Sequence, residues 1–60
     1  MDLVEEIAQH LYRTGWKGNE NNINWRVRNE FVERSGDMPS QENARTIIER
    51  LKELSAQNKK

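Results

Sequence analysis

Three arginines fall within a nine-residue stretch in the middle of the chain: Arg26, Arg28 and Arg34. Trp25 and Phe31 are interleaved with them. Arginine forms paired, charge-assisted hydrogen bonds with phosphate oxygens, and most protein–DNA hydrogen bonds go to phosphate and sugar. This stretch therefore suits contacts with a nucleic-acid backbone. The alternative is a solvated helix face on which the arginines pair with Glu30 and Glu33.

A second stretch, from Ser40 to Thr46, holds side chains that can recognise bases. Gln41 and Asn43 suit adenine, and Arg45 suits guanine. In a helix–turn–helix protein, such residues lie at the start of the recognition helix, which enters the major groove. Glu42 departs from this pattern because it would repel phosphate. The same residue types are also common at ordinary helix starts.

The chain contains two tryptophans, Trp16 and Trp25. Tryptophan can anchor a protein interface, stack on bases or fill a small core. The core is the favoured place for Trp25. Trp16 lies between Gly15 and Gly18, and it is equally suited to the core and to a role as the anchor for a protein partner.

Catalytic and metal-binding chemistry has little support in the sequence. His10 is the only histidine, and the chain has no cysteine. A catalytic histidine needs a nucleophile or an orienting carboxylate within reach, whereas Glu6 suits only a surface pair with it. Neither metal-ligand spacing nor a phosphate-binding glycine loop is present. We therefore predict a protein that is not an enzyme, with no metal site and no cofactor.

Ten basic and ten acidic residues give a formal net charge of zero. This excludes a protein that binds nucleic acid by bulk electrostatic attraction. Residues 1–24 carry two cations against four anions, and residues 25–60 carry eight against six, so an anion-binding surface is expected in the later part. No apolar stretch approaches the roughly 20 residues of a membrane span. The first residues also lack a signal-peptide pattern, so we expect a cytoplasmic protein without membrane contact.

An apolar stripe predicts a first helix over residues 2–14. Its members recur with helical spacing: Leu3, Val4, Ile7, Ala8, Leu11 and Tyr12. Asp2 is a suitable N-cap, Glu5 completes a pair resembling a capping box, and Gly15 is a suitable stop.

A similar stripe predicts a last helix over residues 40–56, again with helical spacing: Ala44, Ile47, Ile48, Leu51 and Leu54. Ser40 is a suitable N-cap for this helix. A polar, frayed tail is expected over residues 56–60.

The segment between these helices begins with a loop over residues 15–24, which contains two glycines and four asparagines. A helix over residues 25–35 is the favoured continuation, with Asn24 as N-cap and Gly36 as stop. Its apolar side chains are Trp25, Val27, Phe31 and Val32, and Arg28 falls in the middle of their arc. The alternative is a short β-hairpin within residues 15–28, because apolar and polar residues alternate from residue 23 onwards.

These observations predict an all-α fold, a small three-helix domain over residues 1–60 with helix–turn–helix-like order. The leading function is a helix–turn–helix-type nucleic-acid-binding or regulatory protein that docks its third helix on DNA. The residues expected to contact phosphates or bases are Arg26, Arg28, Arg34, Gln41, Asn43 and Arg45.

The alternative function is a non-catalytic protein-binding module, an adaptor or inhibitor of a larger protein, anchored by Trp16. No small-molecule substrate is expected. A homodimer is expected to supplement the small core. The initial Met1 and the polar tail favour a complete chain over a fragment.

Overall fold

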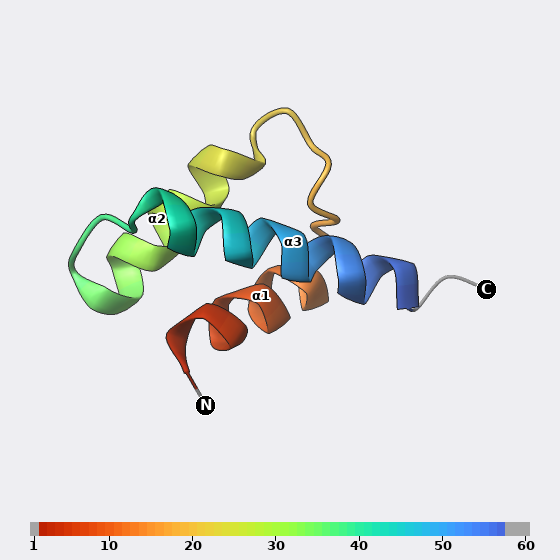
Figure 1. Ribbon diagram of the computed structural model, residues 1–60, viewed down its shortest axis with the longest axis horizontal. Coiled ribbons are helices and arrows are strands. Elements are labelled where there is room, and N and C mark those ends of the chain that lie inside the picture. Colours follow the sequence, from red (N-terminus) through yellow and green to blue (C-terminus); the bar gives the residue numbers. More distant parts are fainter. Residues whose placement is uncertain (1, 58–60) are drawn as a thin grey trace.

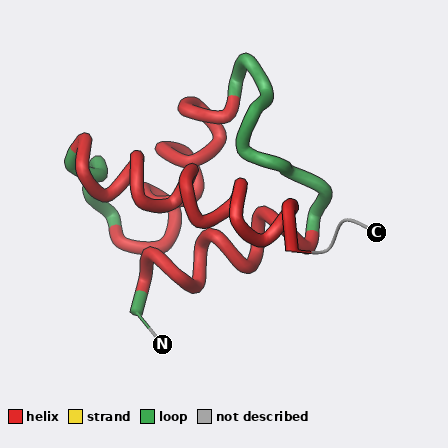
Figure 2. The backbone as a smooth tube through the Cα atoms, turned by 45° about the vertical axis from the view of Figure 1, so that its right-hand side comes forward, coloured by secondary structure: helices red, strands yellow, loops and turns green. Residues whose placement is uncertain are grey.

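The computed structural model describes residues 2–57, which form three helices. These are α1 (Leu3–Arg13), α2 (Ile23–Ser35) and α3 (Gln41–Gln57) (Figure 1). Both views of the backbone show α1 and α3 side by side, with α2 lying across the first half of α3 (Figures 1 and 2). The packing of α1 on α3 is the most extensive, and α2 touches α1 only lightly. The predicted three-helix, all-α fold is confirmed.

The core lies where the apolar stripes of the three helices meet. Nine hydrophobic residues are buried there: Ile7, Ala8, Leu11, Ile23, Val27, Phe31, Ile47, Leu51 and Leu54. The remaining stripe residues of α1 and α3 are partly buried and pack against these nine. Both predicted stripes are therefore confirmed as core faces.

The helix ends are set by side chains and turns that satisfy free backbone groups. The backbone N–H of Glu5 donates to Asp2 Oδ1 over 3.1 Å at the start of α1. The backbone N–H of Asn43 donates to Ser40 Oγ over 3.1 Å at the start of α3. Gly36 ends α2 in the left-handed conformation, with φ of 82°. These three ends agree with the sequence prediction.

Three expectations for the middle segment are wrong. The β-hairpin is absent, since none of the described residues forms a strand. The helix begins at Ile23 after Asn22, so Asn24 is not its N-cap. Trp25 is 67% exposed and does not belong to the core.

The core face of α2 consists of Ile23, Val27 and Phe31, which recur every four residues. Arg28 is exposed on a different face from these three. Trp25 and Val32, which flank Arg28 on the outer part of the predicted apolar arc, are exposed, so the place of Arg28 in that arc does not bury it.

The loop between α1 and α2 is hydrogen-bonded to α1 and packs against α3. The backbone N–H of Trp16 donates to the Leu11 carbonyl over 3.0 Å. The Glu20 carboxylate accepts hydrogen bonds from the backbone N–H groups of Lys17 and Gly18 over 3.1–3.2 Å. Gly18 is buried against the third helix. The loop is therefore an ordered part of the domain.

The C-terminal tail and a membrane span are the two remaining features for which the sequence gives an expectation. The polar tail was expected over residues 56–60, but α3 extends to Gln57 and residues 58–60 lie outside the described part. Between residues 2 and 57, no helix combines the length and the apolar character that crossing a bilayer requires.

Candidate nucleic-acid interface

A groove of about 360 Å³ separates the first half of α2 from the start of α3. Asn24 and Arg28 line it from α2, and Ser40, Gln41 and Arg45 line it from the other side. Pro39, Ala44 and Ile48 complete the lining. The groove therefore joins three of the predicted site residues, Arg28, Gln41 and Arg45, although 13 or more positions separate Arg28 from the other two in the sequence.

The two arginines of this groove have free charges. Neither Arg28 nor Arg45 has a carboxylate within ion-pair distance in the part of the chain that the structure describes. The groove lining contains no acidic residue. The guanidinium carbon of Arg28 lies 5.9 Å from the ring centroid of the exposed Trp25, a distance that suits a cation–π contact. The groove is thus a small cationic surface beside an exposed aromatic ring.

Asn43 belongs to the predicted base-reading set but does not line the groove. It is half-buried, and its backbone N–H is used in the cap with Ser40. Glu42 is exposed next to the groove at the start of α3. Of the predicted base-reading residues, Gln41 and Arg45 are therefore the two that the fold brings to the cationic surface.

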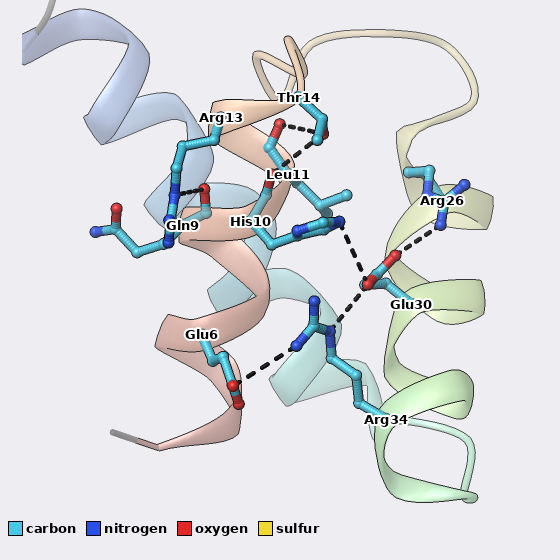
Figure 3. Close-up of polar contacts among 9 residues, drawn as sticks. All are labelled: Glu6, Gln9, His10, Leu11, Arg13, Thr14, Arg26, Glu30 and Arg34. Atoms are coloured by element: carbon cyan, nitrogen blue, oxygen red, sulfur yellow. Dashed lines mark hydrogen bonds and ion pairs between the residues drawn. The ribbon is translucent and has the colours of Figure 1, made fainter.

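Arg26 and Arg34 lie on the side of α2 that faces α1, where both bind Glu30 (Figure 3). Arg26 Nη2 donates to Glu30 Oε1 over 2.6 Å, and Arg34 Nε donates to Glu30 Oε2 over 2.9 Å. Arg34 Nη1 also lies 3.6 Å from Glu6 Oε2 on α1. The charges of these two arginines are therefore largely neutralised, and the structure separates them from Arg28.

Glu30 is the only buried charged residue among those described, with 4% of its surface exposed. His10 Nε2 on α1 lies 3.6 Å from Glu30 Oε2. The spacing of Arg26, Glu30 and Arg34 by four residues each is visible in the sequence. The burial of Glu30 and its contact with His10 are not, because they depend on how α1 packs against α2.

Burial of the Glu30 carboxyl raises its pKa, but hydrogen bonds from Arg26 and Arg34 outweigh this effect and hold the pKa below the ordinary value of 4.5. The pKa of Glu5 is also lowered, mainly by the hydrogen bond from Arg50 and to a smaller extent by the one from Gln9. Both carboxylates are therefore more acidic in the folded chain than in the unfolded one. Their contribution to stability is fully present above the unfolded pKa and is lost as pH falls through the folded pKa.

We expect the free energy of unfolding to decrease as pH falls below about 4.5, and we expect Glu30→Gln to make this decrease shallower. Urea unfolding followed by circular dichroism between neutral and acidic pH measures the effect. Glu33→Gln is the matched control, because Glu33 is an exposed carboxylate of the same helix with no ion-pair partner in the described chain. Equal pH slopes for Glu30→Gln and Glu33→Gln would contradict the conclusion that Arg26 and Arg34 lower the pKa of Glu30.

Trp16, the predicted protein anchor, is half-buried and packs against the core. It lines a separate cleft beside the second half of α3, which Tyr12 and Lys52 also line. The structure therefore places Trp16 away from the arginine groove, whereas Trp25 lies beside it.

Comparison with known proteins gives no relative from which a function could be transferred: no family model, curated protein or solved structure matches the chain.

Proposed function

We propose that this chain is a cytoplasmic, non-catalytic regulatory protein of the helix–turn–helix type that binds duplex DNA through the groove between α2 and α3. Gln41 and Arg45, at the start of α3, approach base edges in the major groove. Arg28, on α2, contacts the phosphate backbone. In this arrangement α3 is the recognition helix and α2 crosses the backbone.

One observation carries this proposal: the described lining of the groove holds a glutamine and two arginines without an ion-pair partner in residues 2–57, and it includes no acidic residue. In a chain with no net charge, such a local excess of positive charge is what phosphate contacts require. Helix α3 follows α2 in the order of a helix–turn–helix motif, but residues 36–40 make the turn longer than the usual three or four residues.

Arg26 and Arg34 take a different part in this proposal from the one expected from the sequence. Glu30 and Glu6 neutralise them, so they contribute little to phosphate binding, and Arg34 also joins α2 to α1 through Glu6. Two free arginines make few contacts with DNA. A homodimer that presents two copies of the groove to two half-sites would double them. The dimer is therefore part of the proposal, and sedimentation with and without DNA tests it.

Arg28→Gln should weaken binding to a random-sequence duplex about tenfold, as expected for the loss of one charge-assisted hydrogen bond. It should also reduce the slope of log K against log salt by about 0.9 per lost phosphate contact.

Arg45→Gln should instead relax sequence preference at one base pair, by roughly 1–3 kcal/mol, in duplexes selected from a random pool. Fluorescence anisotropy at several salt concentrations measures both effects.

Arg13→Gln is the matched control for charge loss, because Arg13 is an exposed arginine at the end of α1, outside the groove. Its affinity should stay close to that of the parent. Equal losses of DNA affinity for Arg13→Gln and Arg28→Gln would show that binding depends only on the net charge of the protein. The groove would then no longer be the proposed DNA-binding site.

The second candidate is a protein-binding module, which is favoured by the exposure of two large apolar side chains. Trp25 is 67% exposed and Met38 is 62% exposed, and tryptophan and methionine are enriched at protein interfaces. In this candidate Trp25, beside Arg28, replaces Trp16 as the anchor.

Capture of binding partners from a nuclease-treated lysate separates the two candidates. The protein-binding module would be favoured if the chain captured one stoichiometric protein, if Trp25→Ala abolished this capture and if Arg13→Gln preserved it.

A further inference from the structure

A second and larger cleft, of about 780 Å³, lies beside the other half of α3. It is bounded by the end of α1, the loop that follows α1, and the last turns of α3. The groove of the proposed DNA interface is lined by residues 41–48 of α3, whereas this cleft is lined by residues 52–56. The two sites share no lining residue and can therefore be tested separately.

The lining of this cleft combines aromatic surface with positive charge. Tyr12 and Trp16 are half-buried and pack against the core, so their remaining surface forms an apolar wall. Lys17 and Lys52 also line the cleft, and none of its described lining residues is acidic. Lys52 Nζ lies 3.8 Å from Glu49 Oε2 on the exposed side of α3, and Lys52 has no other ion pair within residues 2–57. The cleft therefore suits a ligand with an apolar, flat body and a negative charge.

The wall of the cleft is formed before any ligand binds. The Glu20 carboxylate accepts hydrogen bonds from the backbone N–H groups of Lys17 and Gly18, which holds the turn of the loop. The backbone of Gly18 lies close to α3, since a Cβ added there would lie 3.1 Å from the Ile48 carbonyl oxygen and 3.2 Å from the Lys52 backbone nitrogen. A preformed site loses less conformational entropy on binding than a mobile loop, and its volume lies within the range of small-molecule pockets, about 300–1,000 Å³.

We propose that this cleft binds a small organic anion with an aromatic body, such as an aryl carboxylate. The aromatic part packs on Tyr12 and Trp16, and the carboxylate lies between the ammonium groups of Lys17 and Lys52. This proposal is independent of DNA binding.

The test uses 4-phenylbutyrate as the probe and 4-phenylbutylamine, which has the opposite charge, as its matched control. The probe is titrated into the ¹⁵N-labelled chain, and amide shifts are followed by NMR. We expect saturable shifts confined to residues 12–19 and 52–56, with the amine binding about tenfold more weakly. Lys17→Gln should weaken the acid severalfold, and Arg45→Gln, in the other groove, should leave it unchanged.

The dispersion of the amide spectrum shows for each variant that the chain is still folded. Three results would overturn the proposal: no saturable shifts at millimolar probe, equal binding of the acid and the amine, or shifts centred outside the cleft. None of them bears on the DNA interface, because the reporting amides of that interface lie at residues 24–28 and 40–45.

Discussion

Leu51→Ala is expected to unfold most of the protein at physiological temperature. The Leu51 side chain is fully buried in the middle of α3, the helix on which both α1 and α2 pack. Replacing a buried leucine with alanine costs about 2–5 kcal/mol, because transfer free energy is lost and a cavity remains. A domain of this size gains only about 3–5 kcal/mol from its core. Urea unfolding followed by circular dichroism measures the loss.

Val32→Ala is the matched control for Leu51→Ala. Val32 is an aliphatic residue of α2 with 37% of its surface exposed, so its truncation should change stability by much less than that of a buried leucine. If Leu51→Ala had an unfolding midpoint as close to the parent as Val32→Ala, the face of α3 identified as the core would be wrong.

Gly18→Ala is expected to cost about 2–5 kcal/mol, for two reasons that add. The residue has φ of 92°, a left-handed conformation that costs an alanine about 1–2 kcal/mol. A Cβ atom there would also lie 3.1 Å from the Ile48 carbonyl oxygen and 2.9 Å from Lys52 Cγ. Relieving this overpacking costs about 1–3 kcal/mol, since the loop or the helix must shift.

Gly15→Ala separates these two contributions. Gly15 also has a positive φ, of 102°, but nothing lies within 4 Å of the position of its added Cβ. It should therefore show the conformational cost alone, about 1–2 kcal/mol. Chemical denaturation of both variants gives the comparison. Equal losses at the two glycines would contradict the close packing of the loop on α3.

The outer helices could be predicted from the sequence because their information is local. The stripes of α1 and α3 repeat at the helical period over several turns, and Asp2 and Ser40 supply recognisable caps. The end of α2 at Gly36 could also be predicted, because the left-handed conformation that ends a helix favours glycine. Each of these features depends on residues within one or two turns of each other.

The middle helix was harder to predict because its apolar residues form a wide arc that Arg28 interrupts. With a start at Trp25, the helix offers no clear core face, and the large apolar side chain of Trp25 favours the interior. A start at Ile23 adds the residue that completes the repeat of Ile23, Val27 and Phe31. Asn22, the actual N-cap residue, makes no side-chain cap hydrogen bond, so it gave no distinctive signal.

The candidate site could be predicted only in part. The residue types of Arg28, Gln41 and Arg45 indicated anion and base contacts, and the fold places these three around one groove. Arg26 and Arg34 pair with Glu30 at a four-residue spacing that is visible in the sequence, whereas the contacts of His10 with Glu30 and of Glu6 with Arg34 come from α1. Such contacts between distant segments are not encoded in any local pattern.

Binding of duplex DNA by the groove is tested most directly by NMR mapping. The ¹⁵N-labelled chain is titrated with a random-sequence duplex at low salt, where even non-specific DNA-binding proteins associate. We predict shifts concentrated at residues 24–28 and 40–45, weakened by added salt, with little change at residues 30–34. An absence of shifts at micromolar duplex, or shifts centred on α1 and residues 30–34, would contradict the account.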